Sequence, residues 1–535
     1  MRFIAGAVPL AGLWGLPLLL SLLALAPSLA DHEAWALLLR HPQLRPSLAL
    51  SLFTGVAATA LALAAALVML AGLHGSALWR KLQGLSAAGL ALPHLAFAIG
   101  FGFLIMPSGL VARLFSGGDM PPSWITVQDP LGLSLIVALA VKEIPFLLTA
   151  ALSVLSRGDA EGRRELEMRA AASLGHGRGS AWLRILLPPL LRELRWPLVI
   201  VFVYGATVVD MALVLGPTQP PTFAVVIWTA LNHASPEMNR MGLAGTLLLT
   251  MSIGLVIAMA GLMLRLLRHR QQLMLTAGPS LLQAPRRTAR LILAAACLTL
   301  LASLLILLLL SLSQRWPYPG VLPPSFSGQA WAALAMAAAP LWLSLGLGLA
   351  ASITAVVLAV VWFETQPPAR DAWPTVLALV CLAVPQLAVA GGQYRLFLDT
   401  GLAGSIAGLF LAHLTPVAAY VLIVLQGPYR AFDARYMKAA RALSASGSAA
   451  WLSVKLPLLK APLLTSAAIG FAVSIMQFVP AQLIAAGRFS TLPMEAVTLS
   501  SGGSRPLTAA FALALAVPPL LAFLGAALLG RPRWR

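Results

Sequence analysis

A succession of membrane-length apolar runs constrains this chain more than any other feature of its sequence. A helix that crosses a bilayer needs about 20 mostly apolar residues. Hydrophobic residues make up 59% and charged residues only 10% of the 535 residues, whereas soluble domains carry about 25% charged residues. We therefore expect an all-α integral membrane protein with about 12 transmembrane helices. The predicted spans cover residues 4–26, 47–73, 85–108, 130–155, 194–216, 241–264, 290–313, 336–363, 374–397, 402–426, 463–486 and 506–530.

Three details qualify these spans. The first run follows Arg2 and resembles a signal peptide, but because further spans follow it, we expect a first transmembrane helix. The polar interval Gly392–Arg395 is a candidate break in its helix. The two cysteines, Cys297 and Cys381, lie in apolar runs without ligand-type neighbours, which predicts neither a disulfide nor a metal site.

The basic residues between the runs predict the orientation of the chain. With a cytoplasmic N-terminus, the inner segments hold 27 Lys and Arg and the outer segments eight, while Lys142 lies within a span. Cytoplasmic loops of membrane proteins are enriched in Lys and Arg. We therefore expect both termini in the cytoplasm. The net charge of +19 then reflects topology rather than nucleic-acid binding.

Two polar, helix-prone stretches stand out between the apolar runs. Residues 169–188 read RAAASLGHGRGSAWLRILLP, and residues 438–457, at an offset of 269, read KAARALSASGSAAWLSVKLP. Trp182 and Pro188 recur as Trp451 and Pro457. Because six is an even number of spans, a second copy enters the membrane in the same direction as the first. We predict two parallel six-helix repeats, 1–268 and 290–535, joined by a cytoplasmic linker, 269–289.

Each stretch has the pattern of a helix, a tight turn and a second helix. In the first copy a helix over 159–174 ends at Gly175, Ser180 is a candidate cap for the next helix, and Pro188 is expected to end it. In the second copy we expect Asp433 to cap the first helix. We also expect a turn over 444–448 and a helix over 449–455. One such elbow could be an ordinary interfacial connection, but two matched copies favour contact with a soluble partner.

These stretches resemble the cytoplasmic loop of permeases from binding-protein-dependent ABC importers. That loop carries Glu-Ala-Ala, three residues, Gly, nine residues, Ile, one residue and Leu-Pro. The matching positions here are Ala170, Ala171, Gly175, Ile185, Leu187 and Pro188, and then Ala439, Ala440, Leu456 and Pro457, with Val454 in place of Ile. The motif's Glu is replaced by Arg169 in the first copy and by Lys438 in the second. The motif's Gly is replaced by Ser444 in the second copy. The resemblance covers nearly the whole chain and is greatest to the fused, double-length permeases of iron(III), thiamine and similar small-solute importers.

The resemblance implies a function and a set of partners. In that family the elbow is the coupling helix, which docks on an ATPase subunit, so two ATPase copies holding ATP and Mg²⁺ are implied. A periplasmic solute-binding protein, a small solute and import across the bacterial inner membrane are implied as well. The chain itself contains no G-x-x-x-x-G-K-[ST] phosphate-binding loop. We therefore expect a transport subunit that is not an enzyme and binds no cofactor.

Polar side chains within the predicted spans are candidates for the translocation pathway, since such groups are costly in a bilayer. Interhelical hydrogen bonding is the structural alternative for each of them. His94, Lys142, Arg395 and His413 are further polar groups in the spans. The four candidates with the most suitable positions are Glu143, Asp210, Gln393 and Gln477.

Two other classes of function are alternatives for a chain of this composition. An ion-coupled secondary transporter with two parallel repeats would use Glu143 or Asp210 for the coupling ion, but it does not require paired elbows. An intramembrane enzyme is disfavoured because the eight histidines and 17 acidic residues are dispersed without metal-ligand spacing.

Overall fold

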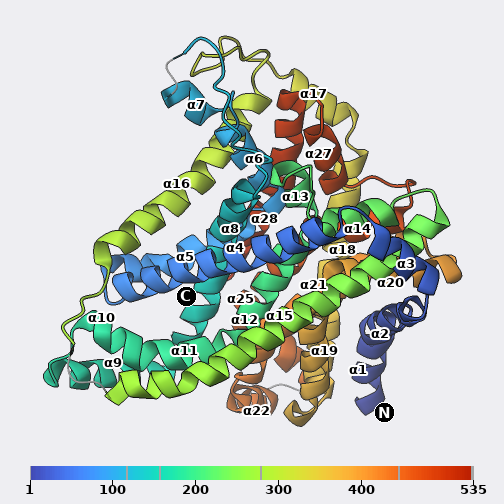
Figure 1. Cartoon of the computed structure of the whole chain (residues 1–535). Coiled ribbons are helices and arrows are strands. Elements are labelled where there is room, and N and C mark those ends of the chain that lie inside the picture. Colours follow the sequence, from blue (N-terminus) through green and yellow to red (C-terminus); the bar gives the residue numbers. More distant parts are fainter. Residues whose placement is uncertain (1, 116–117, 156–157, 277–279, 444–445, 532–535) are drawn as a thin grey trace.

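The computed structural model describes residues 2–115, 118–155, 158–276, 280–443 and 446–531. Within these ranges the regular structure is helical, apart from one isolated bridge between Ser313 and Phe326. Figure 1 shows the helices crossing one another at steep angles, with several short helices at the upper and lower ends of the molecule. The all-α prediction is confirmed.

The helices up to the middle of the chain begin and end as follows. They are α1 (Arg2–Leu10), η1 (Ala11–Gly15), α2 (Leu16–Leu23), η2 (Ala26–Leu29), α3 (His32–Arg40), α4 (Leu44–Leu73), α5 (Ala77–Ala91), α6 (His94–Ile105), α7 (Leu110–Phe115), α8 (Leu133–Leu155), α9 (Gly158–Ser173), α10 (Arg178–Ala181), η3 (Trp182–Leu186), α11 (Leu187–Glu193), α12 (Arg195–Thr207), α13 (Asp210–Leu215), α14 (Phe223–Leu231) and α15 (Pro236–Thr276).

The remaining helices follow after residue 280. They are α16 (Arg286–Ser311), α17 (Gln329–Met336), α18 (Ala339–Thr365), η4 (Pro368–Arg370), α19 (Ala372–Ala383), α20 (Gln386–Asp399), α21 (Ile406–Arg430), α22 (Ala434–Leu443), α23 (Gly447–Ala450), η5 (Trp451–Lys455), α24 (Leu456–Leu458), α25 (Lys460–Ile475), α26 (Val479–Ala485), α27 (Leu492–Ser500) and α28 (Arg505–Leu529). Because α15 extends to Thr276 and α16 begins at Arg286, much of the predicted linker is helical.

Among the described residues, nine helices are long and apolar enough to cross a membrane, or up to 11 when two bent pairs each count as one span. The predicted span over 194–216 is not one continuous helix, because it breaks at Val208–Val209 between α12 and α13. β-branched residues disfavour helix, and Thr207 Oγ1 donates a 2.7 Å hydrogen bond to the Val203 carbonyl just before the break. The predicted span over 463–486 is likewise divided, by the break from Met476 to Phe478.

Two further breaks are caused by prolines. The predicted span over 85–108 divides at Leu92–Pro93, and the span over 374–397 divides at Val384–Pro385 with a bend of 102°. The residue before a proline is driven out of the helical region, and Leu92 and Val384 are extended with ψ 123° and 136°. The expected break at 392–395 was wrong, because those residues lie inside α20.

The first helix of each half of the sequence packs against the other half. Leu10, Trp14 and Leu18 are buried in one apolar cluster with residues of α18, α19 and α21. Trp14 Nε1 donates a 2.8 Å hydrogen bond to the Thr415 carbonyl. In turn, Ala289 and Leu293 of α16 are buried against α4, α5 and α8. Helix α1 packs on α18 and α2 on α20, and α16 packs on α4 and α6.

The outer helices leave their apolar side chains uncovered. Leu255 and Leu262 on α15, and Leu298 and Leu301 on α16, are each about 60% exposed or more. A helix that is apolar on its exposed face is suited to lipid. These two helices therefore form part of the surface that faces the hydrocarbon.

Candidate functional site

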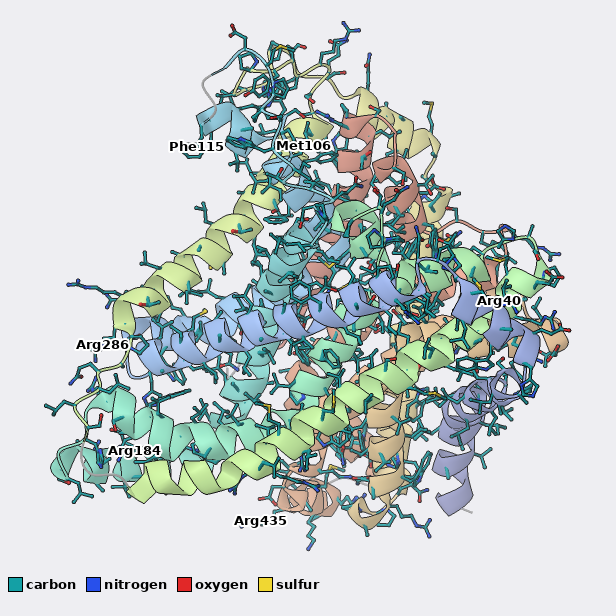
Figure 2. All side chains as sticks on the ribbon, viewed as in Figure 1. Arg40, Met106, Phe115, Arg184, Arg286 and Arg435 are labelled. Atoms are coloured by element: carbon teal, nitrogen blue, oxygen red, sulfur yellow. The ribbon has the colours of Figure 1, made fainter. Side chains whose placement is uncertain are left out.

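The two stretches at residues 169–188 and 438–457, named here the first and second elbow, lie at the same end of the molecule. Figure 1 shows α9 to α11 and α22 at the lower edge, opposite α7 and α17. Figure 2 shows Arg184 and Arg435 at this lower end and Met106 and Phe115 at the upper end. A partner on one side of a membrane could therefore reach both elbows.

The first elbow is built as the sequence predicts up to its turn. Helix α9 ends at Ser173, and Gly175 takes the left-handed backbone conformation with φ +85°, which glycine adopts without steric cost. The predicted cap at Ser180 was wrong. Helix α10 already begins at Arg178, and Ser180 Oγ instead lies 3.3 Å from His176 Nδ1.

Pro188 does not end the second helix of the first elbow, in contrast to the prediction. The π-helical segment η3 leads directly into α11, in which Pro188 and Pro189 occupy the second and third positions. A proline inside a helix removes one hydrogen bond of the i to i−4 ladder, and the π turn η3 lies at the point where that bond is missing. The wider π turn before it shifts the register, so the chain continues as helix.

The apolar side of the first elbow is buried and its polar side is open. Trp182 is 2% exposed and Ala171 5%, and Trp182 lies in one apolar cluster with residues of α4 and α8. Ile185, Leu187 and Pro188 are half-buried, whereas Arg169, Ala170 and Gly175 are exposed. Leu166 on α9 and Leu174 directly after it are exposed by 66% and 70%, so this part of the elbow presents large apolar side chains outward.

The second elbow has the same order of helices. Asp433 accepts a 2.9 Å hydrogen bond from the Arg435 backbone N–H at the start of α22, as predicted for a cap. Helix α23 begins at Gly447, with Ser446 Oγ accepting from the Ala449 N–H at 3.1 Å. Ser444 lies outside the described residues. Pro457 is inside α24, after which the chain bends by 71° into α25.

The motif residues of the second elbow are less buried than those of the first. Lys438, Ala439 and Pro457 are exposed. Those that are half-buried are Ala440, Trp451, Val454 and Leu456.

Glu364, at the end of α18, anchors the second elbow to the membrane helices. Its Oε1 accepts hydrogen bonds from Trp451 Nε1 at 2.8 Å and from Lys455 Nζ at 2.6 Å, and also from the Tyr429 hydroxyl on α21. The Lys455 ammonium lies 4.5 Å from the centre of the Tyr429 ring. One carboxylate therefore joins η5 to two long helices. In the first elbow, by contrast, Trp182 Nε1 has no hydrogen-bond partner among the described residues.

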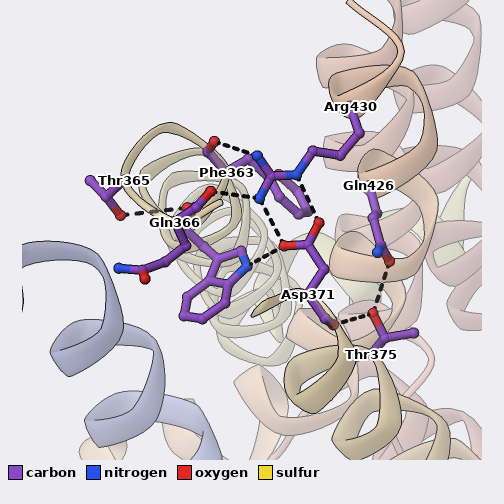
Figure 3. Close-up of polar contacts among 8 residues, drawn as sticks. Phe363, Thr365, Gln366, Asp371, Thr375, Gln426 and Arg430 are labelled. Atoms are coloured by element: carbon purple, nitrogen blue, oxygen red, sulfur yellow. Dashed lines mark hydrogen bonds and ion pairs between the residues drawn. The ribbon is translucent and has the colours of Figure 1, made fainter. Parts of the chain in front are cut away.

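A second ionic network lies next to this anchor (Figure 3). Arg430 donates to both carboxylate oxygens of Asp371, at 2.7 Å each, and to the carbonyls of Phe363 and Gln366 at 2.9 Å. Trp362 Nε1 donates to the same carboxylate at 2.9 Å. Bidentate Arg–carboxylate pairs are strong and directional. The ends of α18 and α21 and the start of α19 are thereby fixed together beside the second elbow.

The basic residues that replace the motif's acid are both on the surface. Arg169 Nε lies 3.2 Å from Glu165 Oε1 one turn earlier on α9. Lys438 is exposed on α22. Each is accessible to a protein that docks on the elbow.

Lys142 and Glu143, two of the polar residues in the predicted spans, lie beside the break between α5 and α6. Backbone that is not helical at membrane depth must have its polar groups satisfied by protein. Lys142 Nζ on α8 donates to the carbonyls of Gly89 at 2.7 Å and Leu92 at 2.6 Å, at the end of α5. The next residue, Glu143, accepts from or donates to His94 Nε2 at 3.2 Å, at the start of α6. This adjacent pair holds both sides of the break at Pro93.

Asp210 lies at a second break, as the first residue of α13, and is 9% exposed. It interacts electrostatically with His94, whose ring centre lies 4.8 Å from that of Tyr204. Glu143, His94 and Tyr204 are therefore in contact with one another across α8, α6 and α12, and Asp210 lies within electrostatic range of His94 and Tyr204.

Gln393 and Gln477 lie apart from these residues, around α21. Gln393 Nε2 donates to Thr415 Oγ1 at 2.8 Å, and Gln477 Nε2 donates to the His413 carbonyl at 3.0 Å. His413 Nδ1 lies 2.8 Å from Ser474 Oγ. Gln477 Oε1 has no hydrogen-bond partner in the described part of the chain.

Several residues of the site were not predicted from the sequence. Glu364, Tyr429, Asp371 and Arg430 occur at the inner ends of predicted spans, where polar residues are common and give no indication of a specific partner. A signal did exist, because Glu364 is the only acidic residue in the sequence from 336 to 370. The two cysteines are free. No cluster of three potential metal ligands occurs within the described ranges.

Comparison with known proteins identifies the family. No protein-family model matches the chain. The inner membrane ABC transporter permease protein YnjC of Escherichia coli (strain K12) is 31% identical over 519 residues, which cover 96% of this chain and 93% of that protein.

Two further relatives match over shorter regions. The thiamine transport system permease protein ThiP of Escherichia coli (strain K12) is 28% identical over 323 residues, 58% of this chain and 56% of that protein. The spermidine/putrescine transport system permease protein PotC of Haemophilus influenzae is 24% identical over 167 residues, 31% of this chain and 65% of that protein. The near full-length match, together with the all-helical, multi-span fold, shows that this chain belongs to the family of inner-membrane ABC transporter permease proteins, whose members have no ATPase activity of their own.

Proposed function

We propose that this chain is the permease of an importer, in which a separate ATPase dimer drives a small solute inward and a periplasmic binding protein delivers it. The observation that carries the proposal is the pair of elbows at one end of the molecule, each containing the spacing of the coupling-loop motif. ATP and Mg²⁺ would be bound by the ATPase subunits. The ion-coupled alternative is set aside, because the relatives are ABC transporter permeases.

The proposal includes two parallel repeats with both termini in the cytoplasm. It is supported by the order of elements, since α4, α8 and the elbow in the first half are followed by similar elements α18, α21 and the elbow in the second. The breaks at Pro93 and Pro385 also occupy comparable places. The ratio of 27 inner to eight outer basic residues supports the orientation.

Each elbow would transmit the closure of one ATPase subunit to the membrane helices. The exposed side chains of Leu166 and Leu174 suit an apolar groove on the partner. Burial of Trp182 fixes the elbow to the membrane helices. In the second elbow the same role falls to Trp451 and Lys455 through Glu364. The two anchors therefore use different chemistry for one mechanical task.

The translocation pathway would pass the helix breaks, because Asp210 and Gln477 lie at two of them and Glu143 on α8 contacts His94 at a third, while Gln393 lies within α20. Irregular backbone at membrane depth is tolerated where it is covered by protein or lines a cavity. Two of the relatives are permeases of a thiamine and of a spermidine/putrescine transport system, and these solutes are organic cations. Carboxylates beside tyrosines suit a cation, so these compounds are the first to test.

The test is uptake into proteoliposomes that contain the chain and its ATPase, supplied with the binding protein. We expect uptake of radiolabelled solute that stops when ATP is removed, and loss of uptake at unchanged expression in Asp210→Asn. Transport that continues after ATP depletion would rule out the proposed function. Unchanged uptake by the Asp210 variant would remove only that residue from the pathway.

The basic residues of the elbows lead to a further prediction about the ATPase. Because Arg169 and Lys438 replace the motif's acid, we expect the ATPase surface opposite them to be acidic or neutral. The double variant Arg169→Glu and Lys438→Glu should reduce co-purification of the ATPase by about tenfold, as expected when like charges are brought together at an interface. Full assembly and transport by this variant would contradict the prediction.

A further inference from the structure

The segment Ser280–Gln283, named here the linker strap, lies directly on the first elbow. The Gly177 backbone N–H donates to the Ser280 carbonyl at 2.8 Å, and the Ser180 N–H donates to the Leu282 carbonyl at 3.1 Å. In the opposite direction, the Ser280 N–H donates to His176 Nδ1 at 3.3 Å. Three hydrogen bonds therefore join residues that are more than 100 positions apart in sequence.

The strap serves as the cap of the second helix in the first elbow. The first N–H groups of any helix have no partner within the helix. Helix α10 has no side-chain cap at Gly177, and its N–H groups at Gly177 and Ser180 are satisfied by carbonyls of the strap. The strap thus takes the place of a capping side chain.

Two glycines make this close approach possible. A Cβ atom at Gly177 would lie 2.5 Å from the Leu282 carbonyl oxygen, and one at Gly179 would lie 2.6 Å from the Gln283 carbonyl oxygen. Both obstructing atoms belong to the backbone, so a methyl group could be accommodated only if the strap moved. Neither glycine has a positive φ, so contact with the strap, and not backbone conformation, requires glycine here.

The second elbow is capped in a different way. Ser446 Oγ accepts from the Ala449 N–H at 3.1 Å. A Cβ atom at Gly447, the first residue of α23, would meet nothing within 4 Å. The matching helix start is therefore open where the first elbow is covered.

The outer side of the strap is apolar and exposed. Leu281 is 80% exposed and Leu282 53%, and Leu174 at the end of α9 is 70% exposed. At the second elbow the exposed groups include Leu452, at 58%, and Arg435, whose side chain is 88% exposed. The first elbow thus offers an additional apolar surface that belongs to the linker.

We propose that the linker strap is a fixed part of the first elbow and forms one wall of its ATPase docking surface. The strap is hydrogen-bonded to the coupling-loop motif itself, so a subunit that docks there meets Leu281 at the edge of the same surface. The two ATPase contacts of this permease then differ in chemistry, although they arise from matched motifs. This inference rests on the proposed docking of an ATPase at the elbows.

The test is photo-crosslinking in the full chain co-expressed with its ATPase. A photo-crosslinking residue replaces Leu281 in one variant and Leu452 in another, and each is combined with Gly179→Ala or with the matched control Gly447→Ala. We expect both positions to crosslink to the ATPase. Gly179→Ala should reduce the Leu281 crosslink by about tenfold, because overpacking displaces the strap, and leave the Leu452 crosslink unchanged. Gly447→Ala should change neither.

The outcomes separate the inference from the function on which it rests. Alanine is a better helix former than glycine, so loss in Gly179→Ala cannot come from weakening of α10. Crosslinks from Leu452 but none from Leu281, or lipid adducts at Leu281, would overturn the inference alone. A Leu281 crosslink that Gly179→Ala does not change would also overturn it. Absence of ATPase crosslinks at both positions would overturn the proposed docking itself.

Discussion

Lys142 illustrates how a charge is retained in the middle of a membrane helix. Its side chain is 1% exposed, and its ammonium donates to two carbonyls at the end of α5. Those carbonyls have no partner within α5, because the helix ends before Pro93. A cation at a helix C-terminus is also favoured by the helix dipole. The charge therefore stabilises a break that the proline causes, and its role is structural.

We expect Lys142→Met to lower the free energy of unfolding by about 2–3 kcal/mol, the usual worth of a hydrogen bond to a charged group. Thermal unfolding of the detergent-purified protein measures this change. Lys81→Met, which removes an exposed lysine from α5, is the matched control. Equal melting temperatures for the two variants would show that Lys142 does not hold the break.

Glu364 on α18 bonds both to the second elbow and to Tyr429 on α21 through one carboxylate oxygen. We expect Glu364→Gln to preserve ATPase assembly and ATP hydrolysis but to reduce solute uptake per ATP by about fivefold, within the range of coupling mutations. The ratio of uptake to hydrolysis in proteoliposomes gives the result. Glu33→Gln, which removes an exposed partner of Arg240 from another ion pair, should leave this ratio unchanged.

A merely structural role for Glu364 would give a different result. It would lower the amount of folded complex and leave the uptake per ATP of the remaining complex at the wild-type value. That outcome would contradict the prediction.

At the scale of elements, the sequence predicted the existence of the spans better than their continuity. Apolar runs identify spans because the bilayer sets one length for all of them. The proline breaks at Pro93 and Pro385 were readable in principle, whereas the break at Val208–Val209 contains neither proline nor glycine. The elbows show the converse, since Pro188 looked like a helix end and lies inside continuous helix because η3 precedes it.

The candidate site was only partly predictable for a related reason. Motif spacing locates the elbows, because spacing along a helix is local. The partner of Trp451, by contrast, comes from Glu364, 87 residues away, and the strap reaches the first elbow from 104 residues away. Such contacts depend on how the elements pack, which no local pattern reports.

Close approach between helices makes a prediction at this scale. A Cβ atom at Gly100 on α6 would lie 2.4 Å from the Ser303 carbonyl oxygen on α16. We expect Gly100→Ala to destabilise the protein by about 1–3 kcal/mol, the usual cost of overpacking. Gly254→Ala on α15, where a Cβ would meet nothing within 4 Å, is the control. Thermal unfolding measures the stability of both variants. Equal melting temperatures would contradict the close contact of α6 with α16.

At the scale of the whole molecule, the exchange of first helices joins the two halves. Helix α1 packs on α18, α2 packs on α20, and η1 packs on α21. In the other direction, α16 packs on α4 and α6. Removing residues 1–23, which leaves η2 in place against α15, should therefore uncover α18 and α20 and leave α4 and α8 covered. We expect faster hydrogen exchange in α18 and α20 of the truncated protein, with α4 and α8 unchanged, measured by mass spectrometry. Faster exchange confined to α4 and α8 would contradict this arrangement.

The hydrogen bond from Trp14 to the Thr415 carbonyl also has a consequence for biosynthesis. The two residues are 401 positions apart. At about 5–20 residues per second, the ribosome needs about 20–80 s to complete the partner of a helix that entered the membrane at the start. During this time the first helix rests in lipid with its eventual contact face uncovered. The later helices must therefore pack against the first helix after it has already entered the membrane. The order of synthesis is thus part of the folding mechanism.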